Sequence, residues 1–440
     1  MSLITNRWSP HRLYNKCKAT TLLPSTSQFH RHSSTMISSP QKPVLISGAG
    51  LASLLLAQSL RHSGIPFHIY ERDASISTRA QGYRLRLSTE GLDAIESVLP
   101  PDQWKAFWAA CGKTGGSNGG LTVLNAVTAE DITEDKSRPV DQETKSGQNS
   151  LTSRDGLVIG IARGEMRNRF AKGCEDSIHF SHQITGYEST ATGVHALFAD
   201  GTKSPEGSLL VGGEGIYSKV AKQLSAGALK VFDTGARGIH GQAPTSAFKG
   251  LGEGVWRIVD ETRPDGKVFI ITNVRPDAKD DPDVMLGWTL GGQPGVIEAP
   301  GGNYAVVGKV AADLAKELTK NWHPSLRPLF EQMDVGEAAF WKITCSTPRG
   351  VPEWKNDPRV TVIGDAVHSM TPAGGIGANT AVRDSALLGR LLREAGGWGE
   401  HVTGEYEKKM RVYGSEAVGK SYGMASGMFG VKLDENSPTV

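Results

Sequence analysis

The chain has 440 residues, of which 38% are hydrophobic and 7% aromatic, and its formal net charge is +2. This length predicts two or three domains, or one large composite domain. A charge so near zero gives no strong basic field, so we expect no nucleic-acid partner. The four cysteines are widely spaced without a Cys-x-x-Cys pair, and neither a disulfide framework nor a metal site is indicated. No apolar run is long enough to span a bilayer.

The first 42 residues are basic and rich in Ser and Thr, and they contain no acid, because Glu71 is the first acidic residue of the chain. This is the composition of an organelle transit peptide. The alternative is an over-extended start, with Met36 as the true first residue shortly before a strand at Val44. In both cases we expect residues 1–42 to be disordered. We expect a cytoplasmic protein, or a mitochondrial one if residues 1–42 are a transit peptide.

Residues 44–73 read as a strand, a glycine turn, an apolar helix and a second strand that ends in an acid. Gly48 permits the tight turn, and Gly50 lets the backbone approach a pyrophosphate at the positive end of the helix. The glutamate at the end of the second strand can accept hydrogen bonds from ribose hydroxyls. The pattern predicts a dinucleotide site that contains Gly48, Ala49, Gly50, Ser53, Glu71 and Arg72.

The next elements alternate between helices and strands. We expect a helix at 89–98, a strand at 121–124, a polar insertion near 127–155, a helix within 161–174, and a hairpin within 193–211 that returns to a buried strand. Strand-like runs at 268–271, 285–288 and 305–307, with helices at 310–321 and 325–333, predict a separate and mainly antiparallel sheet. Further helices are expected at 378–394 and 404–424.

A second glycine-rich element follows a buried strand at 360–364. Its glycines place free backbone N–H groups at the N-terminus of a long helix, which predicts a second site for an anion or a carbonyl. Asp365, at the strand end, is placed to bind a polyol hydroxyl. A domain that binds NAD alone needs no such element, whereas a flavin dinucleotide extends past its pyrophosphate and does. The element contributes Gly364, Asp365, Pro372, Gly375, Gly377, Ala378 and Asn379.

Three motifs in order give a resemblance to a known family: 48–53, 212–220, and Gly364-Asp365 with the loop 372–379. On these the chain resembles the single-component FAD-dependent monooxygenases, the aromatic-hydroxylase type with the p-hydroxybenzoate hydroxylase-like fold. Arg163, at the head of its helix, matches the family arginine that supports the flavin. Shorter stretches at 81–84, 322–324 and 374–379 resemble fungal members of secondary metabolism.

The resemblance implies an α/β fold: a Rossmann-like FAD-binding domain built from discontinuous segments, with an inserted, mainly antiparallel β-sheet substrate domain and C-terminal helices. After the extension 1–42 we assign residues 43–225 to the first part of the FAD-binding domain and 226–344 to the substrate domain. Residues 345–395 form the second part of the FAD-binding domain, and 396–440 the C-terminal helix and tail.

Two positions depart from the family pattern. The middle motif is normally Ala-Asp-Gly and reads Gly213-Glu214-Gly215 here, and the resemblance implies that it serves both flavin and nicotinamide binding. Glu214 keeps the charge of aspartate but reaches one methylene further, which bears on the reduction step. Ser53 stands at the third glycine position, where helix and strand pack closely, and we expect a small shift there.

The resemblance implies that NADH or NADPH, as a transient co-substrate, reduces the FAD. Dioxygen then supplies one oxygen atom to a small or medium organic substrate, aromatic or polyketide-like. His240 and His323 are candidates for a catalytic base, although a lone histidine is more often structural. Arg84, on a strand near the flavin domain, is assigned to cofactor binding. The alternatives are an FAD oxidase or dehydrogenase on the same fold, and a non-enzymatic flavin-binding protein.

Overall fold

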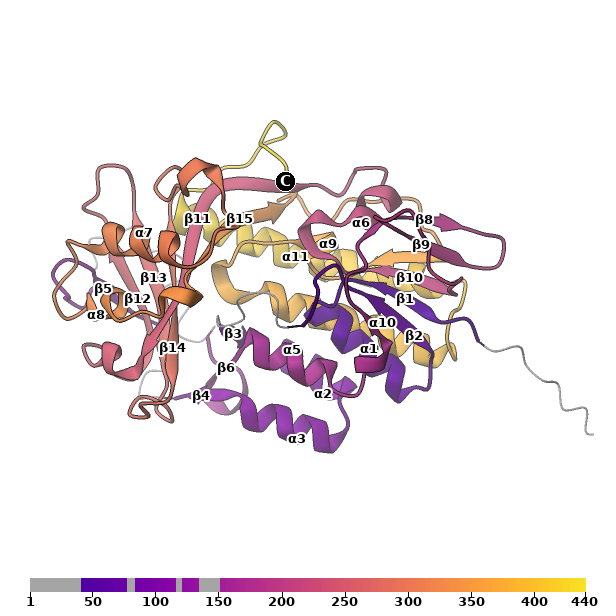
Figure 1. The fold of residues 1–440 in the computed structure, drawn as a ribbon, viewed down its shortest axis with the longest axis horizontal. Helices are drawn as coiled ribbons and strands as arrows, with labels where there is room; N and C mark the ends of the chain where they lie inside the picture. Colours follow the sequence, from indigo (N-terminus) through magenta and orange to yellow (C-terminus); the bar gives the residue numbers. More distant parts are fainter. Residues whose placement is uncertain (1–40, 77–83, 116–120, 134–150) are drawn as a thin grey trace, which may run out of the picture. The chain divides into compact units, whose positions relative to one another are not determined.

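The structure is a computed structural model that describes residues 41–76, 84–115, 121–133 and 151–440 (Figure 1). The predicted disorder of residues 1–42 falls almost wholly outside the described residues, as does most of the polar insertion predicted near 127–155. Over the described ranges, no helix combines the length and the hydropathy that crossing a membrane requires.

The first sheet has five parallel strands in the order β16-β10-β1-β2-β7. Its strands are β1 (Val44–Ser47), β2 (Phe67–Tyr70), β7 (Ile178–His179), β10 (Leu209–Gly212) and β16 (Val360–Val362). All residues of β1 and β10 are buried, as expected of parallel strands covered on both faces. Ser47 pairs with Gly212 and Gly212 with Val362, so three strands from distant parts of the sequence end at one edge. The three glycine motifs begin at this edge.

Helices cover this sheet on one side, and a small helix with a hairpin lies on the other (Figure 1). On the helical side α1 (Leu51–His62) packs between α5 (Arg163–Ala171) and α10 (Gly377–Glu394). Helix α10 also contacts α2 (Thr89–Val98) and α11 (Val402–Phe429), and α3 (Pro101–Ala110) contacts α2 and α5. The other side carries α6 (Lys219–Leu224) and the hairpin of β8 (Ile184–Ser189) and β9 (Val194–Phe198). The one-turn helix α9 (Asp365–His368) follows β16.

The second sheet has six strands in the order β15-β11-β14-β13-β12-β5. It consists of β5 (Leu121–Asn125), β11 (Val231–Pro244), β12 (Gly254–Asp260), β13 (Val268–Val274), β14 (Met285–Gly292) and β15 (Ala339–Ser346). All neighbours are antiparallel except β12 and β5. One face packs on α7 (Lys309–Thr319) and α8 (Pro328–Glu331) through a core that includes Trp288, Trp322 and Phe330. The other face carries His240 and contacts the end of α11, where Phe269 and Phe429 pack with ring centroids 5.0 Å apart.

A third, three-stranded antiparallel sheet, β3-β6-β4, connects these two parts. Its strands are β3 (Arg84–Leu87), β4 (Gly112–Thr114) and β6 (Val158–Ala162). Thr114 Oγ1 donates to Asn273 Oδ1 of the second sheet at 3.0 Å. Arg86 Nη2 donates to the carbonyl of Gly374, in the second glycine loop, at 2.8 Å. The three-stranded sheet therefore contacts both the second sheet and the cofactor loop.

The predicted fold class is confirmed, with local differences. The helix expected within 161–174 begins only at Arg163, because the apolar residues before it form β6. Residues 305–307 form no strand and make only an isolated bridge between Val307 and Ala339. The predicted strand at 121–124 exists as β5, but it lies in the second sheet rather than beside its sequence neighbours. The domain limits stay a prediction, to which β5 adds a segment of the second sheet from within residues 43–225.

Candidate functional site

The first glycine turn is fixed by close backbone approach. Gly48 has a φ of 81°, and a Cβ built on it would lie 2.9 Å from the Cα of Glu214 and 3.0 Å from the carbonyl oxygen of Gly213. Only glycine fits such a position. Helix α1 begins after Gly50 without a side-chain cap and without an acid in its first turn. Its first N–H groups are therefore available to a ligand, and the helix dipole favours an anion there.

Glu71 holds this turn from the end of β2. Its carboxylate is 7% exposed and accepts hydrogen bonds from the backbone N–H groups of Ala49 at 2.7 Å and Asp73 at 2.9 Å. Arg167 lies 3.7 Å from the same carboxylate and donates to the carbonyls of Ala49 and Ile76. A carboxylate has further lone pairs with which to accept a ribose hydroxyl. Sequence reasoning missed Arg167, whose only signal was its position one turn after Arg163 on α5.

The two departures from the family pattern meet in space. A Cβ built on Gly213 would overlap the Oγ of Ser53 and would lie 3.2 Å from the carbonyl of Ser47. Ser53 is fully buried, and among the described residues its Oγ has no hydrogen-bond partner. The glycine at 213 thus makes the room that the serine at 53 needs. The two positions form one packing unit beneath the first turn of α1.

Glu214 uses its extra length to reach α6. Its Oε1 accepts from the N–H of Val220 at 3.0 Å, next to the Ser218 Oγ that accepts from Ala221. Its Oε2 is buried and has no hydrogen-bond partner in the described part of the chain. Burial raises the pKa of this carboxyl group, and the Val220 N–H partly offsets the rise. Glu214 therefore caps α6 with one carboxylate oxygen, while its backbone lies beside the first glycine turn.

A buried network supports the Gly364-Asp365 turn. Gly364 has a φ of 63°, and its N–H donates to Asp384 Oδ2 at 2.6 Å. The same oxygen lies 2.8 Å from His368 Nε2, and Tyr413 donates to Asp384 Oδ1 at 2.6 Å. Burial alone would lower the pKa of His368, but the Asp384 carboxylate outweighs it and the pKa is raised. His368 therefore braces the turn.

Asp365 is the first residue of α9, and desolvation of its carboxyl group by the surrounding protein raises its pKa. The positive charges of His368 and Arg163 act in the opposite direction on this pKa. The electrostatic interaction with Arg163 places α5 and the β16 turn at one site. The assignment of both residues to the cofactor stays a prediction.

The loop 372–379 is held by one side chain. Asn379 donates to the carbonyls of Gly375 at 2.8 Å and Arg86 at 2.9 Å, and its Oδ1 accepts from Ser88 N at 2.8 Å. Helix α10 starts at Gly377, like α1 without a side-chain cap and without an acid in its first turn. The loop therefore presents a second helix N-terminus at the edge where β16 ends.

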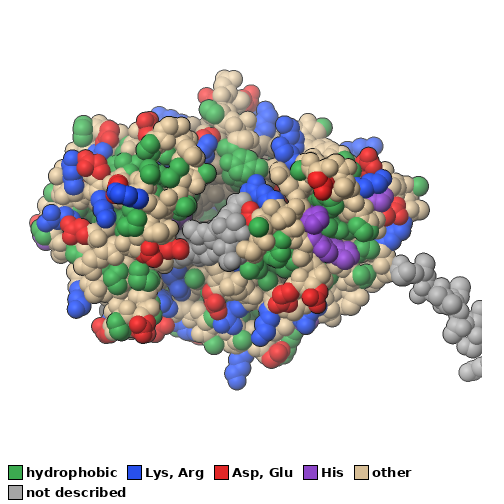
Figure 2. Space-filling view, viewed as in Figure 1, with side chains coloured by type: hydrophobic (Ala, Val, Ile, Leu, Met, Phe, Trp, Pro, Cys, Tyr) green, Lys and Arg blue, Asp and Glu red, His purple; other side chains and the backbone are tan. Residues whose placement is uncertain are grey.

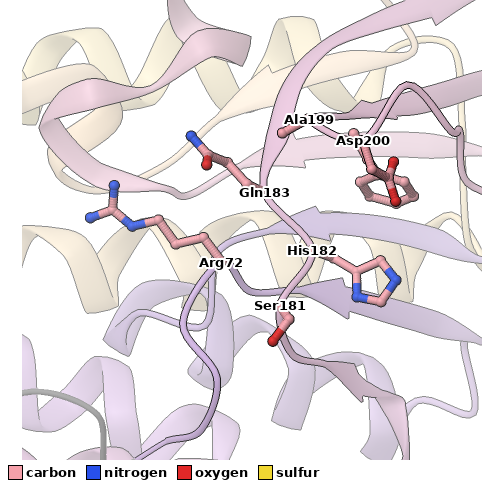
Figure 3. A pocket seen from close by; sticks show the side chains of 7 residues that line it. Arg72, Ser181, His182, Gln183, Ala199 and Asp200 are labelled. Atoms are coloured by element: carbon pink, nitrogen blue, oxygen red, sulfur yellow. The ribbon is translucent and has the colours of Figure 1, made fainter.

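Arg72 and Arg84 lie in different surroundings. Arg72 lines a cavity of about 250 Å³ whose other lining residues are Ser181, His182, Gln183, Phe198, Ala199 and Asp200 (Figure 3). Arg84 donates to the carbonyl of Gly160 at 2.6 Å and lies beside Arg275. It is Arg86, two residues on, that contacts the cofactor loop. The cofactor roles of Arg72 and Arg84 stay predictions.

The two candidate histidines are far apart in the fold. His323 lies between α7 and α8, and its Nδ1 pairs with Ser325 Oγ at 2.8 Å within one turn. His240 lies on the face of the second sheet away from α7, where its Nδ1 pairs with Thr289 Oγ1 and its ring stacks on Trp341 at 4.9 Å. Burial lowers the pKa of His240 to about 4. His240 is therefore neutral near pH 7.

The site gathers the kinds of group that an extended dinucleotide requires. Two uncapped helix N-termini, the acid of β2 and the exposed Asp365 gather around one edge of the parallel sheet. The positive-φ glycines at 48 and 364 let the backbone approach a ligand without a Cβ in the way. Such a discontinuous Rossmann-like domain beside an antiparallel sheet defines the class of FAD-binding flavoproteins.

The chain belongs to the FAD binding domain family, which matches residues 166–418. This family confirms the prediction of FAD as the cofactor. Over 430 residues the chain is 31% identical to a dual O-methyltransferase/FAD-dependent monooxygenase of Cercospora beticola, covering 90% of this chain and 47% of that protein. The chain thus spans about half the length of this relative. It is also 27% identical to an FAD-dependent monooxygenase of Trichoderma harzianum, over 79% of this chain and 82% of that protein.

Solved structures agree on the fold. HpxO of Klebsiella pneumoniae, determined with FAD and uric acid, has a TM-score of 0.66 at 19% identity. The match covers 88% of this chain and 89% of that one. It supports the fold, including the discontinuous domain that sequence reasoning predicted.

Proposed function

We propose that the protein is an FAD-dependent monooxygenase that uses NADH or NADPH and dioxygen to insert one oxygen atom into an organic substrate. The substrate is small or medium in size and aromatic or polyketide-like. The names of the relatives support the reaction class. Bound FAD supplies the redox chemistry with dioxygen, and the protein positions it.

One observation carries the proposal: the second glycine loop, the end of α11 and the His240 face of the second sheet share one hydrophobic cluster. Ala373 of the loop shares a hydrophobic cluster with Phe269 of β13 and Phe429 of α11. The face that carries His240 and Trp341 therefore lies on the same side as the loop. In the view of Figure 2, the surface is hollowed between the parts of the chain that carry the two large sheets. A substrate on this face would lie next to the loop.

The residues of the chain then have distinct tasks. The N-termini of α1 and α10 bind anionic or carbonyl groups, while Glu71 and Asp365 accept hydrogen bonds from hydroxyls. Backbone N–H groups of the loop favour negative charge that develops near them. His240, neutral and stacked on Trp341, contributes a flat surface and a hydrogen-bonding ring nitrogen rather than a charge.

The experiment uses the purified protein. We expect it to be yellow and to release FAD rather than FMN on denaturation. An accepted aromatic substrate should accelerate NADPH or NADH oxidation, consume dioxygen in step, and yield a product that gains one ¹⁸O atom from ¹⁸O₂. Turnover without ¹⁸O in the product would instead assign an oxidase or dehydrogenase. Bound FAD that neither nucleotide can bleach would assign a non-enzymatic flavin protein.

A further inference from the structure

Two facing glycines form a trough across the three-stranded sheet. Gly112 of β4 and Gly160 of β6 are direct cross-strand partners. The Arg84 side chain extends from β3 over this pair, and its Nη2 donates to the carbonyl of Gly160 at 2.6 Å. A Cβ on Gly112 would lie 2.7 Å from that Nη2. The missing side chains thus let Arg84 reach the far edge of the sheet.

A second arginine lies at the end of this trough. Arg275 follows β13, and the alternation Phe269, Ile271, Asn273 places it on the face that carries His240. The Cβ built on Gly112 would also lie 2.6 Å from Arg275 Cδ and 3.0 Å from its Nη1. Both guanidinium groups therefore approach the same point above Gly112.

The charge of this arginine pair is poorly balanced. Burial, and then the positive charge of Arg275, lower the pKa of Arg84 to about 10. The acid that the described residues offer is Asp277, 3.5 Å from Arg275 Nη1, with 58% of its side chain exposed. Arg275 Nε is buried and has no hydrogen-bond partner among the described residues. Two partly buried cations beside one largely exposed acid are stabilised by a bound anion.

The arginine pair is connected to the cofactor loop through β3, because Arg84 lies two residues before Arg86 on this strand. Arg84 and Arg86 point to the same side of the strand, and Arg86 donates to Gly374 of the loop. A group held by Arg84 and Arg275 therefore belongs to a molecule that lies between the loop and the sheet face. This is the region where the proposed function places the substrate.

We propose that Arg84 and Arg275 form the subsite for a carboxylate of the substrate, which would make the natural substrate an aromatic acid. This inference rests on the proposed function for the identity of the bound molecule. It assigns Arg84 to the substrate rather than to the cofactor. A planar guanidinium suits a carboxylate because it can bind both oxygens.

The test measures binding to the FAD-loaded protein by the change in the flavin absorption spectrum. The probes are 3-hydroxy-2-naphthoate and its uncharged carboxamide. The parent should prefer the acid, and Arg275→Met should weaken binding of the acid roughly ten- to a hundredfold while leaving the carboxamide within about threefold. Compared with Arg275→Met, Arg275→Lys should recover part of the preference for the acid, because lysine restores the positive charge but not the planar guanidinium that binds both carboxylate oxygens.

Arg349→Met is the matched control, since the Arg349 side chain is 83% exposed and forms a surface ion pair with Glu435. It should bind both probes as the parent does. Equal binding of acid and carboxamide by the parent, or no binding of the acid, overturns the proposal. So does an Arg84→Met variant that loses FAD affinity while keeping the preference for the acid, because the pair would then serve the cofactor. Acid-selective binding without oxygen insertion would retain the subsite and refute the monooxygenase function.

Discussion

Gly213→Ala gives the sharpest test of the packing under the first turn of α1. The new Cβ would overlap Ser53 Oγ and press on the Ser47 carbonyl at 3.2 Å. Overpacking of a rigid core costs about 1–3 kcal/mol, so the variant should unfold at lower urea concentration. It should also bind FAD more weakly, because Ser53 lies in the first turn of the helix that receives the pyrophosphate.

The second substitution should rescue the first. Ser53→Gly removes the clashing oxygen, which is also a buried hydroxyl with no hydrogen-bond partner among the described residues. By itself it should be nearly neutral, since a helical glycine costs about 1 kcal/mol and an unsatisfied buried hydroxyl costs about as much or more. In the double variant we expect a favourable coupling energy of about 0.5–3 kcal/mol.

The assay is urea unfolding of the four proteins, followed by FAD titration of each. Gly423→Ala is the control, because its Cβ would meet no atom within 4 Å on helix α11, so it should leave stability equal or slightly higher. Strictly additive effects of the two substitutions on stability would refute the direct packing of Ser53 against position 213. A Gly213→Ala protein with the stability and FAD affinity of the parent would refute it as well.

Three further predictions concern single side chains. Glu71→Ala should weaken FAD binding roughly ten- to a hundredfold, because it removes the acceptor of Ala49 N–H along with the ribose contact; a fluorescence titration measures this, and unchanged affinity would contradict the placement. The pKa of His368 is raised above 6.5 by Asp384, so its ion pair stabilises the fold at acidic pH and is lost as pH rises through the raised value. The stability lost in His368→Gln should accordingly be larger at pH 6 than at pH 9 in urea unfolding, and a pH-independent loss would show that the imidazole is neutral. His240 should add no ionisation to the pH profile of kcat/KM between pH 5.5 and 8.5, because burial lowers its pKa to about 4; a limb near pH 6.5 that disappears in His240→Gln would contradict this.

The sequence predicted those parts of the site that are encoded by short, contiguous patterns. Gly48, Glu71 and Gly364 follow from strand–turn–helix signals, because their geometry depends on neighbours within a few residues. Arg167 and Asp384 support the same turns from positions far along the chain. In the sequence each resembles any charged residue of a helix, because its partner is distant in the chain and is close only in the folded structure.

Long-range pairing explains the remaining differences. Strand β11 runs for 14 residues but contains three glycines and several polar side chains, which obscured its alternation. Its strand character comes from pairing with β14 and β15 on both sides. The two departures, at Ser53 and Gly213, looked independent in the sequence because 160 residues separate them, and only the packing of α1 on the end of β10 joins them.

The pairing of β5 with β12 has a consequence for how the protein can be divided. Residues 121–125 cover the outer edge of a sheet whose other strands all come from 231–346. A fragment cut at the predicted limits of the substrate domain would lose β5 and expose the backbone of 255–259 as an open strand edge. Open edges recruit other strands and promote aggregation. The edge strand of this sheet therefore comes from a segment that precedes the other strands in the sequence. A transfer of the sheet to another protein would have to include residues 121–125.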